Sequence, residues 1–111
     1  MTSHPDTSAV LTLGPPGAQA VLDAEKLVTP GRTWKHLTFD VAPLQVDGIR
    51  SGRIMATIDS QQYLQGYLSV MHMWLHKTQG FTMAADIYTG PAIVDASNVD
   101  EAEAGVGRGV R

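Results

Sequence analysis

Acidic and amide side chains stand directly behind two short apolar runs of the chain. Asp40 follows "WKHLTF", and Asp59 follows "IMATI" and is itself succeeded by Ser60 and Gln61. Carboxylates and amides hydrogen-bond to neighbouring hydroxyl groups, and charge-assisted hydrogen bonds are stronger than neutral ones. These residue types therefore favour a neutral ligand rich in hydroxyl groups.

A glycine- and proline-rich turn, "GPPG" at 14–17, closes a third apolar run, "AVLTL". Its spacing matches neither G-x-G-x-x-G nor the Walker motif, so an ordinary strand-to-helix turn is favoured over a phosphate cradle. Parallel strands bring their carboxyl ends to one edge of a sheet, and open parallel sheets bind ligands there. We therefore predict a ligand-binding edge that contains Gly14, Pro16, Asp40, Asp59, Ser60 and Gln61.

Each acidic residue also has a structural alternative. Asp40 and Asp59 could cap the turns after their strands, because Asp readily bonds nearby backbone amides. Two strand-end carboxylates could also hydrolyse a glycoside, but nothing in the sequence sets their separation. Ser60 lies in "DSQ" and not in a G-x-S-x-G nucleophile elbow. We expect a binding protein and not an enzyme.

The elements that must position this edge alternate along the chain. Apolar runs predict strands over 9–13, 34–39 and 54–58, and helical spacing predicts helices over 18–27, 43–52 and 61–79. The stretch 86–94 reads as extended and is interrupted at Gly90-Pro91, and the tail 100–111 is expected to be flexible. This order predicts an α/β fold, a partial doubly wound parallel sheet of three main strands with covering helices.

Composition narrows the function classes. The chain has 111 residues, 43% of them hydrophobic and 17% charged, which predicts one globular domain. The net charge is −3 and the eight basic residues are scattered, so we expect no nucleic-acid partner. Cysteine is absent, and the pair His72 and His76 lacks both an intervening glutamate and an evident third ligand. We therefore expect no metal and no cofactor.

Four ordered motifs carry a family resemblance: "SHPDTSAVLTLGPPGA", "HLTFD", "IRSGRIMATIDSQQYLQGY" and "ADIYTGPAIVDASNV". Together they resemble the C-terminal part of the type I periplasmic sugar-binding proteins of bacterial ABC transporters, the ribose-binding-like group. The resemblance covers about residues 3–99. It implies one lobe of a two-lobed receptor, in which the turn 14–17, Asp40 and the group 59–61 contact a monosaccharide or polyol.

The resemblance also implies a partner protein, a cellular compartment and two places where the chain crosses between lobes. Members of the family deliver their ligand to a membrane permease and are periplasmic. The chain would form the domain 1–99 and cross between lobes at hinge-like segments near 59–60 and 88–91. The opening "MTSHPDTSAV" does not have the pattern of a signal peptide, and no apolar run reaches the ~20 residues of a membrane span. We therefore expect a truncated receptor that stays in the cytoplasm if it is expressed as written and binds sugar weakly.

Two departures from the family's usual pattern bear on ligand choice. The family's usual Asp-Gln-Gln-Pro is replaced here by Asp59-Ser60-Gln61-Gln62, so Ser60 stands where a long amide is usual. Pro16 stands where a polar residue is common, which removes a hydrogen-bond donor. Both changes alter positions that the resemblance assigns to the sugar.

The helix predicted over 61–79 is apolar around most of its circumference. Helices of this kind are normally buried, so with the other lobe absent we expect a homodimer or swapped assembly through it. The alternative is that the helix covers its own sheet, as in any α/β domain. Two other functions stay open: a self-associating remnant that binds no sugar, and the effector-sensing domain of a transcription regulator, which would require a helix-turn-helix upstream.

Overall fold

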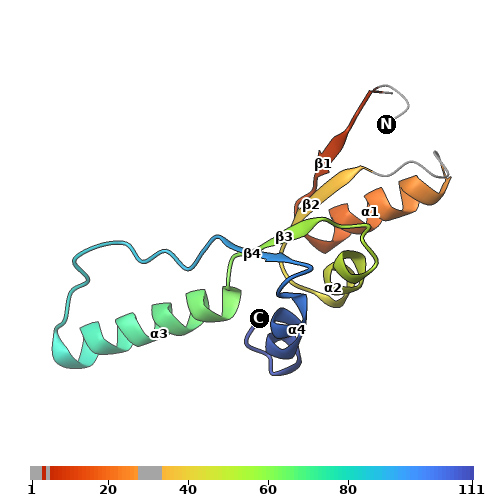
Figure 1. Cartoon of the computed structure of the whole chain (residues 1–111). Coiled ribbons are helices and arrows are strands. Elements are labelled where there is room, and N and C mark those ends of the chain that lie inside the picture. The colour runs from red at the N-terminus through yellow and green to blue at the C-terminus, as the bar shows by residue number, and fades with distance from the viewer. Residues whose placement is uncertain (1–3, 5, 28–33) are drawn as a thin grey trace.

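The computed structural model describes residues 4, 6–27 and 34–111, and these residues form a four-stranded sheet (Figure 1). The strands β1 (Ala9–Leu11), β2 (Lys35–Phe39), β3 (Ala56–Asp59) and β4 (Ala92–Asp95) lie in the order β1-β2-β3-β4. Strands β1, β2 and β3 are parallel, whereas β4 runs antiparallel to β3. The predicted α/β class with three parallel strands is confirmed, and the antiparallel pairing of β4 was not foreseen.

Three helices cover one face of this sheet: α1 (Gly14–Leu27), α2 (Pro43–Arg50) and α4 (Val99–Gly107). Because β1, β2 and β3 follow one another in a single direction, right-handed connections place the intervening helices on the same side. Helix α1 packs against α2, and α2 against α4. The apolar core lies beneath this layer and consists of Ala18, Leu22, Val41, Val46, Ile49, Ile54, Val94, Val99 and Ala102.

The strand register decides which side chains face the helices. Thr38 pairs with Thr57, and Thr57 pairs with Val94, and all three are buried on the helix-covered face. Successive side chains on a strand point to opposite faces, so Phe39 and Ile58 lie on the open face. By the same alternation Asp59, two residues after Thr57, belongs to the covered face.

Helix α3 (Gln62–Gln79) stands away from the sheet together with the returning segment 80–91 (Figure 1). The helix contributes no buried residue, so the alternative in which it covers its own sheet is wrong. Large apolar side chains along it are more than half exposed, among them Tyr67, Val70 and Trp74. Among the helices of the described residues, none combines the length and apolar character that crossing a bilayer requires.

The expectation of a flexible tail over 100–111 differs from the structure, which forms α4 there. Val99 and Ala102 are buried in the core, one helical turn apart. Arg50 of α2 makes ion pairs with Asp100 and Glu103, both at 2.6 Å. Contacts with another helix, rather than the local composition of small residues, therefore order this segment.

Candidate ligand-binding edge

The carboxyl ends of β2 and β3 bring three parts of the chain together. Asp40 follows β2 with a backbone φ of 69°, and its N–H donates to the carbonyl oxygen of Ile58 at 2.9 Å. Its carboxylate faces Gly14, where an added Cβ would lie 3.3 Å from Oδ2. Its other oxygen, Oδ1, accepts a hydrogen bond from Nε2 of Gln62 at the start of α3. The predicted turn and the first predicted acid are therefore neighbours.

The chain leaves the sheet after β3 and returns before β4 at one narrow crossing. Gln61 donates from Nε2 to the carbonyl oxygen of Thr89, and the Thr89 hydroxyl donates to the carbonyl oxygen of Ser60 at 3.0 Å. An added Cβ at Gly90 would lie 3.0 Å from the carbonyl oxygen of Asp59, so glycine allows this close approach without a shift of the neighbouring backbone. The two segments proposed as hinge-like thus lie side by side.

Asp59 is fully buried and does not face the open edge. Its Oδ1 accepts a hydrogen bond from the backbone N–H of Gln61 at 2.8 Å, which is the turn-capping contact that the sequence left open as an alternative. Its Oδ2 lies 3.3 Å from Nε of Arg111 and has no directed hydrogen bond from the described residues. A direct contact between Asp59 and a sugar remains a prediction.

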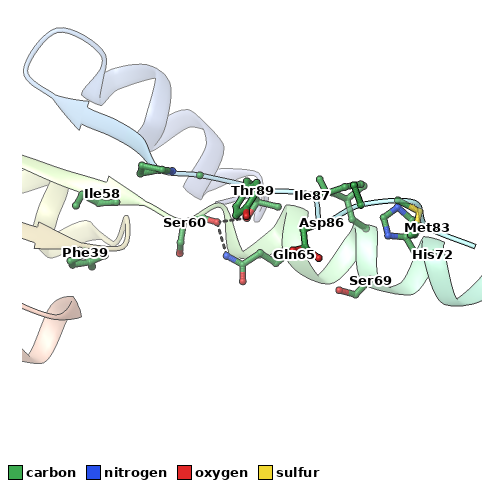
Figure 2. Close-up of a pocket in the computed structure, with 15 residues that line it drawn as sticks. Phe39, Ile58, Ser60, Gln65, Ser69, His72, Met83, Asp86, Ile87 and Thr89 are labelled. Atoms are coloured by element: carbon green, nitrogen blue, oxygen red, sulfur yellow. Dashed lines mark hydrogen bonds between the residues drawn. The ribbon is translucent and has the colours of Figure 1, made fainter.

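A cavity of about 710 Å³ opens between α3, the returning segment and the open face of the sheet (Figure 2). Phe39 and Ile58 come from the strands, and Gln65, Ser69 and His72 come from α3. The returning segment adds a run from Ala85 to Pro91 that includes Asp86 and Thr89. The lining therefore combines hydroxyl, amide and carboxylate groups with aromatic and aliphatic surface.

Ser60 is the one predicted site residue that lines this cavity. Figure 2 shows its carbonyl oxygen accepting hydrogen bonds from Gln65, at 2.7 Å from Nε2, and from Thr89. Both of the Ser60 backbone contacts thus come from residues that line the same cavity. The Ser60 side chain is half-buried in the lining of this cavity, which suits a group that contacts a small polar ligand.

The remaining predicted residues are divided among the edge, the crossing and the covered face. Gly14 and Asp40 are in contact at the edge, and Pro16 is exposed in the first turn of α1. Gln61 holds the crossing, whereas Asp59 lies beneath it. Within residues 4, 6–27 and 34–111, no three histidine or acidic side chains gather as ligands of a metal ion would.

Sequence reasoning missed four polar contacts of this region: Gln62, Gln65, Thr89 and Arg111. Gln62 and Gln65 follow the predicted group directly, and Thr89 belongs to the motif that marked the second crossing. Their types were visible, but their partners depend on how α3 leaves the sheet. No local pattern around Arg111 pointed to Asp59.

Known proteins that resemble this chain are named for carbohydrate transport and sugar binding. A solved carbohydrate transporter from Acidothermus cellulolyticus, in complex with myo-inositol, superimposes with a TM-score of 0.81 and is 37% identical in sequence. The match covers 94% of this chain and 36% of that chain. This chain resembles one part of a sugar-binding transport protein.

A curated relative agrees with this assignment. The xylose/arabinose-binding protein of Sulfolobus acidocaldarius is 28% identical over 103 residues, which cover 87% of this chain and 26% of the relative. No family model matches the chain. The chain thus spans between a quarter and a little over a third of the relatives it matches. The resemblance inferred from the four motifs, and the α/β class expected for one lobe of such a protein, are confirmed.

Proposed function

We propose that this chain forms one wall of the sugar- or polyol-binding cleft of a carbohydrate-transport binding protein, and that it performs no catalysis. The observation that carries the proposal is the structural match, over nearly the whole chain, to a transporter crystallised with myo-inositol. The clustering of Gly14, Asp40 and Gln62 at the carboxyl edge of a parallel sheet supports it.

In this proposal the polar groups divide the work. Asp40 accepts hydrogen bonds from ligand hydroxyl groups, in competition with the amide of Gln62. Ser60 and Gln61 contact the ligand at the crossing, and Gly14 and Pro16 form the floor, where the absence of a Cβ at Gly14 leaves the Asp40 carboxylate accessible. Asp59 acts from beneath by holding the turn.

The longer protein to which such a segment corresponds would pass its sugar to a membrane permease. We propose that permease as its partner and the periplasm as its compartment. Alone, this chain should bind sugar weakly, because closure of two lobes supplies much of the burial that a small ligand needs.

Thermal unfolding in the presence of individual ligands tests the proposal. The panel contains myo-inositol, xylose and arabinose, with sucrose at equal concentration as a control for general exclusion effects. A ligand at about one hundred times its dissociation constant adds ~2.7 kcal/mol, so a rise on the order of 10 °C in Tm is expected. A rise with one ligand supports the proposal, whereas equal or absent shifts with all four compounds contradict it.

A pair of carboxylate variants locates the site. Asp40→Asn keeps the shape of the side chain, and asparagine tolerates the left-handed backbone found there. It should abolish most of the ligand-induced rise in Tm because the charge-assisted acceptor is lost. Asp47→Asn, at an exposed position of α2, is the matched control and should leave the rise unchanged.

A second function is favoured by the exposed face of α3. Tyr63, Tyr67, Val70 and Trp74 are each more than half exposed and fall on one side of the helix, and we call them the α3 stripe. We propose that a second copy of this chain covers the stripe, which gives a homodimer.

A further inference from the structure

Arg111, which follows α4, reaches the buried carboxylate of Asp59 beneath the crossing. Its Nε lies 3.3 Å from Oδ2 of Asp59, whose side chain is 0% exposed, while the Arg111 side chain is 28% exposed. A buried carboxylate requires a counter-charge or hydrogen bonds, because removal of a charge from water is costly. Among the described residues, Arg111 is the charged partner that this oxygen has.

The backbone around α4 is shaped to bring the guanidinium there. The chain turns back after the helix: the N–H of Val110 donates to the carbonyl oxygen of Gly105 at 3.1 Å. The Arg111 side chain then passes directly over Gly105, where an added Cβ would lie 2.9 Å from Cδ and 3.2 Å from Cγ. Because Gly105 has no side chain, the Arg111 side chain has room to reach the sheet.

The other carboxylate oxygen of Asp59, Oδ1, holds the backbone of Gln61. Oδ1 accepts the backbone N–H of Gln61 at 2.8 Å, and Gln61 has φ and ψ of 55°, in the left-handed region. A residue with a Cβ rarely adopts this conformation because it is strained, so a specific contact must offset the strain. Gln61 in turn precedes α3 and bonds the carbonyl oxygen of Thr89.

We propose that Arg111 is a positioning residue for the ligand contacts of the crossing. It neutralises and orients the Asp59 carboxylate, which fixes the left-handed turn at Gln61 and thereby the presentation of Ser60 and Gln61 to the ligand. Arg111 itself touches no ligand. The part of this inference that concerns sugar rests on the proposed function, and the part that concerns the turn stands on the contacts alone.

Amide hydrogen exchange measured by NMR tests the link to the turn without any ligand. Arg111→Gln should speed exchange of the Gln61 amide at least tenfold, because Asp59 loses its counter-charge and no longer holds that N–H in place. The Asp40 amide, which bonds Ile58, is the internal reference and should change much less. Arg111→Lys should restore most of the protection. Arg108→Gln is the matched control, since Arg108 is exposed and forms no ion pair within the described residues.

A second variant displaces Arg111 without altering any charge. Gly105→Ala adds a Cβ in the path of the Arg111 side chain, although alanine is the better helix former. The Gln61 amide should exchange faster in this variant, whereas Gly107→Ala, with no atom within 4 Å of the added Cβ, should leave the exchange rate unchanged. Because neither glycine variant removes a charge, this arm remains informative even if Arg111→Gln fails to fold.

Sugar affinity supplies the second readout. If the wild type binds one of the panel sugars, Arg111→Gln should weaken that binding at least tenfold and Arg111→Lys less. Equal changes at the Gln61 and Asp40 amides, or none at Gln61 in either Arg111→Gln or Gly105→Ala, would overturn the positioning role. No sugar binding by the wild type would defeat the proposed function, while selective loss of Gln61 protection would still support the link from Arg111 to the turn.

Discussion

The carboxylate of Asp40 lies against the backbone of Gly14, close enough that a Cβ on Gly14 would stand 3.3 Å from Oδ2. Gly14 also has a φ of 73°, in the region that favours glycine. Two constraints therefore meet at one residue: the turn into α1 needs a positive φ, and the acid after β2 needs open space. Any side chain at position 14 disturbs both.

Gly14→Ala should consequently lower the free energy of unfolding by about 1–2 kcal/mol, because alanine must adopt a left-handed backbone. It should also weaken binding of any panel sugar by crowding the Asp40 carboxylate. Urea unfolding and ligand-induced shifts in Tm measure the two effects. Gly66→Ala is the control, since an added Cβ there meets no atom within 4 Å and stands within α3. Equal stability of the two variants would contradict the argument.

Removal of the Gln62 amide should have the opposite effect on ligand binding. Nε2 of Gln62 donates a hydrogen bond to Oδ1 of Asp40, so a ligand hydroxyl that binds this oxygen must displace the Gln62 amide. Gln62→Ala frees this acceptor and should strengthen sugar binding several-fold, at a loss of roughly 0.5–1.5 kcal/mol in the free energy of unfolding. Isothermal calorimetry with the sugar that shifts Tm measures the affinity. Gln79→Ala, at an exposed amide on the same helix, should change neither quantity.

His36 predicts a specific dependence of stability on pH. It is fully buried on the helix-covered face of β2, and its Nε2 lies 2.9 Å from the hydroxyl oxygen of Thr12. Burial lowers the pKa of His36 below 6.5, with Arg53 lowering it further and Glu25 opposing. The unfolded chain therefore takes up this proton at higher pH than the folded chain. The stabilisation from neutral His36 is complete above about pH 6.5 and is lost as the pH falls through the lower folded-state pKa.

His36→Gln exposes this contribution by difference. The wild type should exceed the variant in free energy of unfolding at about pH 7.5, and the gap should narrow at about pH 5.5. Thr38→Val changes another buried polar side chain on the same face of the same strand but removes no titrating group, so its effect should not depend on pH. Chemical denaturation at both pH values measures the differences in free energy of unfolding between the wild type and each variant. A difference for His36→Gln that grows on acidification would show that the predicted direction of the pH dependence is wrong.

The sequence predicted the elements well because strands and helices leave local signals, but the direction of Asp59 depends on register. Both faces of β3 carry apolar or small residues, so the pattern "IMATI" did not reveal which face the helices cover. The pairing of Thr57 with Thr38 and Val94 decides this, and it turns Asp59 toward Arg111. The prediction correctly grouped Asp40 with the turn at Gly14, since parallel strands share their carboxyl edge.

Long-range contacts explain the other differences. The tail looked flexible because its small residues carry little local signal, yet Val99 and Ala102 complete the core against α2 and β4. The ion pairs of Arg50 with Asp100 and Glu103 join segments some fifty residues apart, which no local pattern can show. The apolar character of α3, in contrast, was visible in the sequence, and the structure leaves it exposed.

The exposed α3 stripe leads to the last prediction. Tyr63 and Tyr67 stack with ring centroids 6.3 Å apart, and Val70 and Trp74 continue the same side of the helix. Burial of one such large side chain is worth ~1.5–3 kcal/mol, so a second copy that covers the stripe should bind appreciably. Sedimentation equilibrium of the wild type should show a mass that rises with concentration toward that of a dimer.

Trp74→Lys places a charge at the C-terminal end of the α3 stripe and should weaken dimerisation at least tenfold, about 1.4 kcal/mol. Gln79→Lys adds the same charge on the opposite side of the same helix and should leave the dimer intact. Circular dichroism checks that both variants keep their helix content, which separates loss of the interface from loss of the fold. If the wild type stays monomeric across the concentration range, the side chains of the α3 stripe remain exposed to solvent. That result would show that a second copy does not cover the stripe.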